Sequence, residues 1–277
     1  MSPQAYCEEK LARSGSSFAY SLRFLPAPRR HAITVLYAFC REVDDVVDEV
    51  TEPAPARLKL AWWRNEIAAV FGGRPQHPVA LALTDVVGRY PLPREHFDAI
   101  IDGMAMDLDQ TRYQDFATLE RYCYRVAGVV GLLSAEIFGY EDPATRTYAR
   151  TLGIAFQLTN IIRDVGEDAR RGRIYLPQDE MSRFGVSNAD ILGRKPTPAF
   201  QALMAFQVER ARANYASAFA ALPRRDRRAQ RPGLMMAAVY RALLAEIERD
   251  GFRVLDHRTS LTPLYKAWIA WKTSWQY

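Results

Sequence analysis

Two acidic runs lie inside apolar stretches of this chain and restrict how it can fold. They are Arg41-Glu-Val-Asp44-Asp-Val-Val-Asp48 and Gln157-Leu-Thr-Asn160-Ile-Ile-Arg163-Asp164-Val-Gly-Glu-Asp168. A helical residue advances by about 100°, so Arg41, Asp44 and Asp48 fall within roughly 60° of one helix face. In the second run, a face of roughly 80° collects four polar side chains, namely Gln157, Asn160, Asp164 and Asp168. Each run therefore predicts a helix with one acidic face.

These acidic faces need a compensating ligand. Like charges four residues apart destabilise a helix by about 0.2–0.5 kcal/mol per pair. Neither run contains His or Cys, and carboxylates with an amide oxygen suit a hard cation. Mg²⁺ uses few protein carboxylates and completes its coordination with water and phosphate oxygens. Two acidic faces with basic residues beside them therefore predict a site for Mg²⁺ and a diphosphate.

Composition limits the class of protein. The chain has 277 residues, of which 49% are hydrophobic and 25% charged, as is typical of soluble globular proteins. It has no long uncharged apolar run, so no membrane-spanning helix is expected. The segment Met1–Lys10 lacks the apolar core of a secretion signal. Three cysteines without a CxxC motif, Cys7, Cys40 and Cys123, favour a reducing cytoplasm over disulfides or a thiolate metal site.

The net charge of +5 raises the question of a polyanionic partner. Basic residues concentrate in Arg170–Arg173 and Arg224–Arg231, but no basic stripe interleaved with aromatic residues is present. A nucleic-acid partner is therefore not expected. A solvated loop is one interpretation of Arg224–Arg231, and attraction to anionic lipid or a polyanionic substrate is another.

The pattern of apolar residues is helical throughout. Breaks fall at Pro, Gly and short polar clusters, which predicts helices over Pro28–Glu49, Ala56–Phe71, Pro93–Asp109, Phe116–Phe138, Pro143–Asp168, Pro198–Ala221, Gly233–Asp250 and Pro263–Trp275. In this prediction Pro53 and Pro55 close the first helix. The simplest arrangement is one all-α domain over residues 1–277, a helical bundle with the acidic helices facing each other across a central cavity.

Two predicted helices allow more than one interpretation. In Phe116–Phe138, Gly128 and Gly131 lower helix propensity by about 1 kcal/mol each, which indicates close approach of another helix or a ligand. The apolar surface of that segment suits either core packing or a tunnel for a hydrocarbon chain. In Pro263–Trp275 an aromatic stripe suits a helix that caps the core or an anchor at a membrane interface; it consists of Tyr265, Trp268, Trp271 and Trp275.

These motifs resemble the squalene/phytoene synthase family of head-to-head prenyl transferases over about Ser14 to Trp271. The resemblance rests on Ser14-Gly-Ser-Ser17-Phe-Ala-Tyr20, Tyr37-Ala-Phe-Cys-Arg41 with the first acidic run, Tyr122-Cys-Tyr-Arg-Val-Ala-Gly128-Val-Val-Gly131, and the second acidic run continuing into Gly172-Arg173-Ile-Tyr175-Leu176-Pro177. Within the family, other segments most resemble bacterial hopanoid-pathway presqualene diphosphate synthases, namely Ala61-Trp-Trp-Arg64, His77-Pro78-Val79, Met106-Asp-Leu-Asp109-Gln, Arg231-Pro232 and Tyr240-Arg241-Ala-Leu-Leu.

The resemblance implies an isoprenoid-synthase-type bundle that condenses two farnesyl diphosphates to presqualene diphosphate. Squalene, dehydrosqualene or phytoene synthesis is the alternative, and a non-catalytic assembly factor is a remote one. About two or three Mg²⁺ ions are expected with bound diphosphate. NADPH is not expected if presqualene diphosphate is the end product. The enzyme would be cytoplasmic, with peripheral contact to the inner face of the membrane and handover to downstream squalene-pathway enzymes left open.

The resemblance also assigns roles to single residues. The expected metal ligands are Asp44, Asp48, Asn160, Asp164 and Asp168. The expected substrate-binding residues are Ser14, Ser17, Tyr37, Arg41, Gln157, Arg163, Tyr240 and Arg258. Tyr37 and Tyr122 are expected to act in catalysis beside Asp44 and Asp48, because an aromatic face stabilises a carbocation. Salt bridges to neighbouring aspartates are the plain alternative for Arg41 and Arg163, and a helix N-cap is the alternative for the serines.

Overall fold

A computed structural model describes residues 1–14, 22, 25–49 and 52–276 of the chain. The described helices are α1 (Pro3–Arg13), α3 (Ala27–Glu49), α4 (Pro53–Gly72), α5 (Pro78–Val87), α6 (Arg94–Asp109), α7 (Phe116–Cys123), α8 (Val129–Phe138), α9 (Ala144–Arg170), α10 (Gln178–Phe184), α11 (Asn188–Leu192), α12 (Pro198–Ala221), α13 (Arg231–Arg249) and α14 (Pro263–Ser274). A π-helical turn, η1 (Tyr124–Gly128), joins α7 to α8. Within the described ranges the only β-type pairing is one isolated bridge between Arg112 and Ile174.

The predicted all-α helical bundle is confirmed, and most predicted helices lie within a few residues of the observed ones. The boundary predicted at Pro53 and Pro55 is wrong in one respect. Both prolines lie in the first turn of α4 and do not merely separate two helices. The first helical position tolerates proline, because its missing N–H would have no partner inside the helix. None of the described helices is long and apolar enough to cross a membrane.

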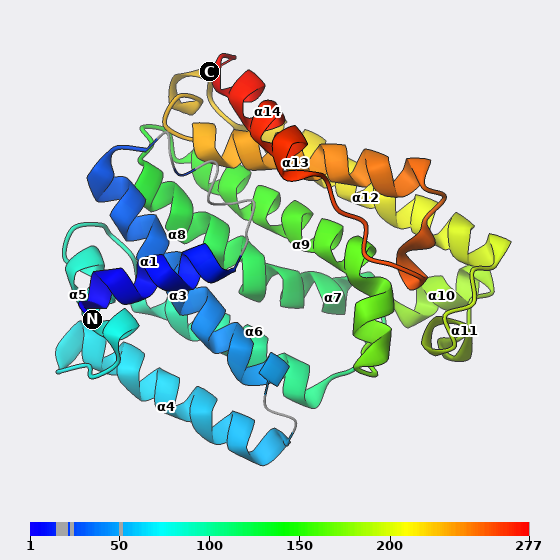
Figure 1. Ribbon diagram of the computed structural model, residues 1–277, viewed down its shortest axis with the longest axis horizontal. Coiled ribbons are helices and arrows are strands. Elements are labelled where there is room, and N and C mark those ends of the chain that lie inside the picture. The colour runs from blue at the N-terminus through cyan, green and yellow to red at the C-terminus, as the bar shows by residue number, and fades with distance from the viewer. Residues whose placement is uncertain (15–21, 23–24, 50–51, 277) are drawn as a thin grey trace.

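Two groups of buried apolar side chains form the interior, and each holds one of the acidic helices. The first group includes Phe39, Val43 and Val47 of α3, packed with residues of α4 to α6. The second includes Leu158, Ile161 and Val165 of α9, packed with residues of α12 and α13. Tyr124 and Val126 of η1 pack against both groups. Figure 1 shows α9 passing through the middle of the molecule beside α8, with α12 and α13 covering it.

Glycines bring α9 into close contact with both η1 and α8. A Cβ atom on Gly131 would lie 2.2 Å from the carbonyl oxygen of Ala149, and one on Gly153 would lie 2.3 Å from that of Ala127. Both distances are too short for any side chain. For Gly131 in the predicted Phe116–Phe138 segment, the close approach of another helix is therefore confirmed, and that helix is α9.

Substituting Gly153→Ala is expected to destabilise the protein by about 1–3 kcal/mol, because the added methyl group overpacks the contact between α9 and η1. The gain in helix propensity from the same change, about 1 kcal/mol, offsets only part of this loss. Gly72→Ala is the matched control, because a Cβ atom there meets nothing within 4 Å. Urea unfolding of both variants measures the difference. Equal stability of the two variants would contradict the close contact.

Candidate active site

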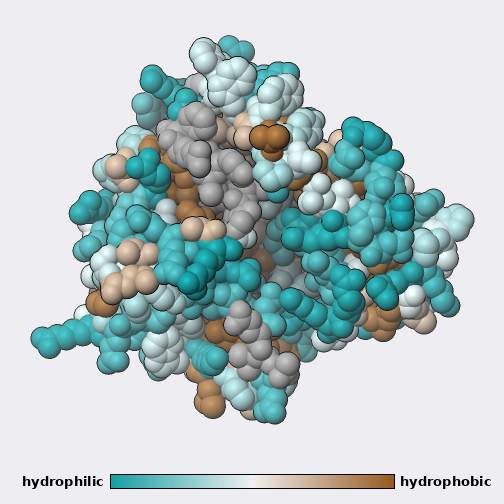
Figure 2. Space-filling model, viewed as in Figure 1, coloured by the Kyte–Doolittle hydropathy of each residue, from teal (hydrophilic) through white to brown (hydrophobic). Residues whose placement is uncertain are grey.

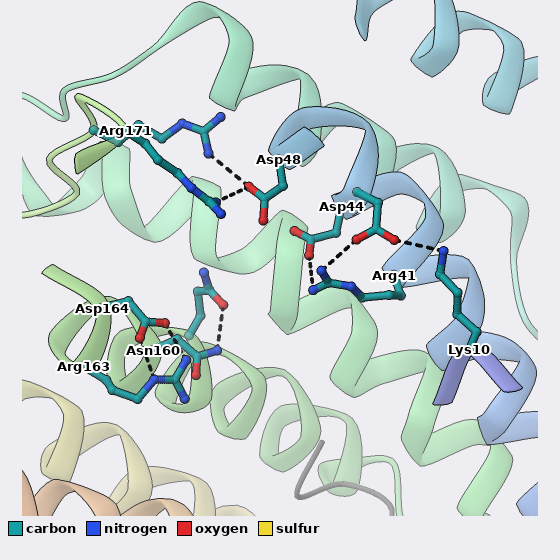
Figure 3. A network of polar contacts seen from close by, with 11 residues as sticks. Lys10, Arg41, Asp44, Asp48, Asn160, Arg163, Asp164 and Arg171 are labelled. Carbon is teal, nitrogen blue, oxygen red and sulfur yellow. Dashed lines mark hydrogen bonds and ion pairs between the residues drawn. The ribbon is translucent and has the colours of Figure 1, made fainter. Parts of the chain in front are cut away.

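The acidic faces of α3 and α9 line one polar cavity of about 400 Å³. Figure 3 shows Arg41, Asp44 and Asp48 on one side and Asn160, Arg163 and Asp164 on the other. The cavity also brings together Tyr37, Tyr122, Gln157, Asp168 and Arg258. The central cavity predicted between the two acidic helices is therefore present. Its lining residues come from widely separated parts of the chain, from Tyr37 to Arg258.

Arginines neutralise several of these carboxylates. Arg41 contacts Asp44 at 2.8 Å and Asp45 at 2.7 Å. Arg163 donates to both oxygens of Asp164, at 2.7 Å from Nε and 2.5 Å from Nη2. The Nε of Arg258 donates to the same carboxylate at 2.8 Å. The salt bridges considered for Arg41 and Arg163 are therefore present, and both guanidinium groups also face the cavity, where an anionic ligand could meet them.

Two further arginines connect the end of α9 to α3. Arg171 Nη1 lies 2.7 Å from Oδ1 of Asp48 (Figure 3), and Arg173 Nη1 lies 3.4 Å from the same oxygen. Arg173 also donates to the backbone oxygen of Val47 at 3.1 Å. The sequence alone predicted no role for the basic run Arg170–Arg173. The available signal was its position directly after the second acidic run, in the motif that contains Gly172, Arg173 and Tyr175.

Negative charge remains in excess despite these pairs. Burial, together with the charge of Asp48, raises the pKa of Asp44 from 3.8 to about 7. Burial, with Asp164 and Asp107 nearby, raises the pKa of Asp168 to about 8. Burial also acts on Asp164, but hydrogen bonds and charges from Arg163 and Arg258 outweigh it and lower that pKa below its usual range. The cavity therefore favours an added positive charge near Asp44 and Asp168.

The donor atoms fit a hard divalent cation. Among the residues described, no three His, Cys, Asp or Glu side chains converge closely enough to hold a metal ion by themselves. Mg²⁺ does not need such a group, because it is bound by one or two carboxylates together with water and phosphate oxygens. On α9 the Oδ1 atom of Asn160 is buried without a hydrogen-bond partner among the described residues. This oxygen and the carboxylates of Asp164 and Asp168 form a set that suits Mg²⁺.

Asp107 of α6 is a site residue that the sequence analysis did not single out. It is buried, accepts a hydrogen bond from the Tyr122 hydroxyl at 2.9 Å and accepts another from the Tyr175 hydroxyl at 2.8 Å. The two tyrosine rings stack with their centroids 5.3 Å apart. Burial raises the pKa of Asp107 to about 6, while the hydroxyl groups and Arg173 oppose this effect. Asp107 therefore fixes the position of Tyr122, one of the predicted catalytic residues.

An apolar cavity of about 290 Å³ adjoins the polar one. The two share a wall made of Tyr37, Cys40, Val126, Gln157 and Asn160. The apolar cavity continues between α3, α8, α9 and α13, where its lining includes Leu36, Phe138, Leu152, Phe156 and Met236. Because Val130 and Ser134 line it while Leu133 is buried in the core, the predicted Phe116–Phe138 segment serves both the core and a cavity.

The remaining predicted site residues are placed differently. Tyr240 lines the apolar cavity, and its ring centroid lies 4.8 Å from that of Phe156. Burial acts to lower the pKa of Arg163, but interactions with Asp164 and then with Tyr240 outweigh burial and raise it. Ser14 follows the C-terminus of α1, and its Oγ donates to the backbone oxygen of Leu11 at 2.7 Å. Ser14 is thus the C-cap of α1, and its predicted contact with diphosphate stays a prediction. Ser17 lies outside the described residues.

Comparison with known proteins identifies the family. The model of the squalene/phytoene synthase family matches residues 11–265. The chain belongs to the squalene/phytoene synthase family. It is 37% identical over 273 residues to a phytoene synthase of Arthrospira platensis, and the alignment covers 94% of this chain and 88% of the relative. It is 38% identical over 264 residues to a 15-cis-phytoene synthase of Synechococcus elongatus, covering 91% and 86% of the two chains.

Solved structures of this family share the fold. A dehydrosqualene synthase in complex with a ligand matches with a TM-score of 0.87 and 29% identity, over 99% of this chain and 96% of that one. Squalene synthase HpnC from Alicyclobacillus acidocaldarius matches with a TM-score of 0.79 and 29% identity, over 90% and 94% of the two chains. This chain is therefore a head-to-head prenyltransferase with the isoprenoid-synthase fold. The relatives compared are named phytoene, dehydrosqualene and squalene synthases, so the finer resemblance to presqualene diphosphate synthases stays a prediction.

The raised pKa of Asp107 predicts how stability depends on pH. A carboxyl group that binds its proton more tightly when folded favours folding at low pH, and this contribution is lost as the pH rises from 3.8 to about 6. We expect Asp107 to lower the free energy of unfolding by about 1.4 kcal/mol per pH unit within that window. Asp107→Asn removes the titrating group, so its stability should fall less steeply over the same window.

Urea unfolding between pH 4 and pH 6.5 measures this slope. Asp109→Asn is the control on the same helix, because the Asp109 side chain is largely exposed and pairs with Arg57. It should reproduce the wild-type slope. If the stability of Asp107→Asn falls with pH as steeply as that of the wild type and of Asp109→Asn, Asp107 is not the titrating group.

Proposed function

We propose that this enzyme joins two identical allylic prenyl diphosphates to a cyclopropylcarbinyl diphosphate in the polar cavity. The observation that carries the proposal is the shared wall between the acidic cavity and the apolar cavity. A prenyl diphosphate has the same division, a polyanionic head and a hydrocarbon tail. Its head would lie between α3 and α9 and its tail between α8, α9 and α13.

The charged residues of the cavity would bind and orient the diphosphate. Arg41, Arg163 and Arg258 present guanidinium groups, which grip phosphate oxygens with paired hydrogen bonds. Asp44 and Asp48 on α3, and Asn160, Asp164 and Asp168 on α9, would hold Mg²⁺. When bound, Mg²⁺ supplies Lewis-acid stabilisation of the diphosphate leaving group.

The tyrosines would act on the hydrocarbon part of the reaction. Departure of diphosphate from one substrate breaks its C1–O bond and leaves an allylic cation, which the 2,3 double bond of the second substrate attacks. Loss of a proton then closes the cyclopropane ring. Tyr37 lies on the shared wall, where its ring can stabilise positive charge. Tyr122, whose hydroxyl donates to Asp107, would relay the proton.

The chain length of the substrate separates two candidate functions. Relatives named phytoene synthases share 37–38% identity with this chain, which favours two C20 substrates and is the better supported candidate. The farnesyl diphosphate reaction predicted from the sequence motifs is the second candidate. It is supported by the fold and 29% identity of the dehydrosqualene and squalene synthases.

A product assay tests the proposal and distinguishes the candidates. Purified protein would be incubated with Mg²⁺ and either farnesyl or geranylgeranyl diphosphate, with and without NADPH, and the extract analysed by mass spectrometry. Turnover of the C20 substrate to phytoene would support the first candidate. Presqualene diphosphate, dehydrosqualene or NADPH-dependent squalene from the C15 substrate would support the second. Absence of every coupled product would contradict the proposed function.

Separate substitutions Asp48→Asn and Asp164→Asn test the metal assignment. Each removes one carboxylate from a different helix, so turnover is expected to fall by about 10²-fold or more and the Mg²⁺ requirement to rise. Asp109→Asn, outside the cavity, should leave both unchanged. Thermal melting of each variant checks the fold, because Asp48 and Asp164 also form ion pairs. Wild-type turnover at saturating Mg²⁺ in either variant would remove that residue from the metal site.

A further inference from the structure

The helix α14 exposes most of its large hydrophobic side chains to solvent. Leu264, Trp268, Trp271 and Trp275 fall within roughly 60° of one face, and their exposed fractions are 85%, 50%, 54% and 77%. The opposite face carries Ile269, Ala270 and Thr273, which are buried. The aromatic stripe predicted for this segment therefore does not cap the core. Ile269, Ala270 and Thr273 face inward instead, and the tryptophans point outward.

This arrangement reverses the usual pattern of a surface helix, whose polar face meets the solvent. Burying one large apolar side chain is favourable by about 1.5–3 kcal/mol, so an exposed row of them indicates a surface that meets a partner. Figure 1 shows α14 on the outside of the molecule against α13. In the same view Figure 2 shows pale and brown groups in this region among largely teal surroundings.

The residues beside this face indicate the chemistry of the partner. Tyr265 lies at its edge with its ring stacked on Trp268, and the Nζ of Lys272 lies 5.1 Å from the centroid of the Trp268 ring. The helix contains two lysines and no acidic residue. Tryptophan and tyrosine prefer the boundary between lipid chains and headgroups, and lysine is attracted to anionic headgroups. The combination is typical of a helix that lies in a membrane interface.

We propose that the exposed face of α14 is a docking surface for anionic lipid bilayers. A second copy of the chain is the other possible occupant, and the experiment below separates it from a bilayer. A bilayer needs no matching shape and rewards the tryptophans and Lys272 together.

The same helix lies next to the polar cavity. The positive charges of Arg163 and Arg258, in addition to burial, lower the pKa of Lys266, which places this part of α14 near two cavity residues. Lys266 lies on the opposite side of α14 from the tryptophans, so a bilayer on the exposed face would be separated from the cavity by about the 10 Å width of this helix. Given the proposed function, this arrangement would shorten the path of a prenyl chain between lipid and enzyme.

Vesicle flotation tests the docking surface without any prenyl substrate, so its result is independent of the proposed function. The probes are vesicles of phosphatidylcholine alone and of phosphatidylcholine with phosphatidylglycerol in equal parts. The wild type should float with the anionic vesicles and less with the neutral ones. Its tryptophan emission should shift to shorter wavelength on binding, because three of the five tryptophans, Trp268, Trp271 and Trp275, are on α14.

Two variants and a control locate the contact. The triple variant Trp268→Ser, Trp271→Ser, Trp275→Ser should lose binding by about tenfold or more, and Lys272→Glu should weaken binding to anionic vesicles only. Trp62→Ser on α4, with a side chain of similar exposure, should bind as the wild type does. Thermal melting should be unchanged in the α14 variants, because these side chains are exposed.

Three outcomes would overturn the proposal. One is a wild type that stays with neither kind of vesicle. Another is equal flotation of the triple variant and the wild type. The third is a wild-type dimer in solution that the triple variant converts to monomers without any vesicle binding, which would assign the face to a second copy of the chain.

Discussion

Negative charge gathered between two helices is the constraint on which the rest of this structure depends. Carboxylates of α3 and α9 face one cavity in which burial makes their charged forms costly. Arginines from three parts of the chain offset that cost, including Arg41 on α3, Arg163 on α9 and Arg171 beyond the end of α9. The raised pKa values of Asp44 and Asp168 show that the compensation is incomplete. Unfavourable electrostatics of this kind are common at binding sites and persist because packing elsewhere holds the groups together.

The packing that holds them is divided between the two halves of the interior. Each acidic helix is anchored in its own group of apolar side chains, so neither can turn its charged face away without exposing buried residues. The segment η1–α8 sets the spacing, because Tyr124 and Val126 pack against both groups while Gly131 lets α8 approach α9. A π-helical turn at this point is in keeping with the frequent occurrence of such turns near functional sites.

Local pattern was enough to predict the helices, the two acidic faces and the cavity between them. The spacing of Asp44 and Asp48, or of Asn160 and Asp164, is a property of single helices and can be read from sequence. Asp107 could not be found in that way. Its partners Tyr122 and Tyr175 are 15 and 68 residues away, so its role depends on how α6 is placed against α7 and the segment after α9.

The aromatic helix shows the same limit in a different form. Periodicity placed Tyr265, Trp268, Trp271 and Trp275 on neighbouring positions of α14, but it could not decide whether they face the core or the solvent. Exposure depends on which face α13 covers, and α13 covers the one with Ile269 and Ala270. Ile269 and Ala270 fill the contact between the two helices, and this leaves the large rings no place in the interior.

The arginines that compensate the carboxylates also organise the site for a polyanion. Arg163 is held by Asp164 through two hydrogen bonds, and Arg258 reaches the same carboxylate from the other side. Their guanidinium groups are thus oriented before any ligand arrives, which reduces the reorganisation needed when phosphate oxygens bind. Under the proposed function, bound Mg²⁺ would neutralise the carboxylates and leave the guanidinium groups to the diphosphate, so that each charge would keep an opposite partner. Without a ligand, the ion pairs of Arg41, Arg163 and Arg258 already make this concentration of aspartates compatible with a stable fold.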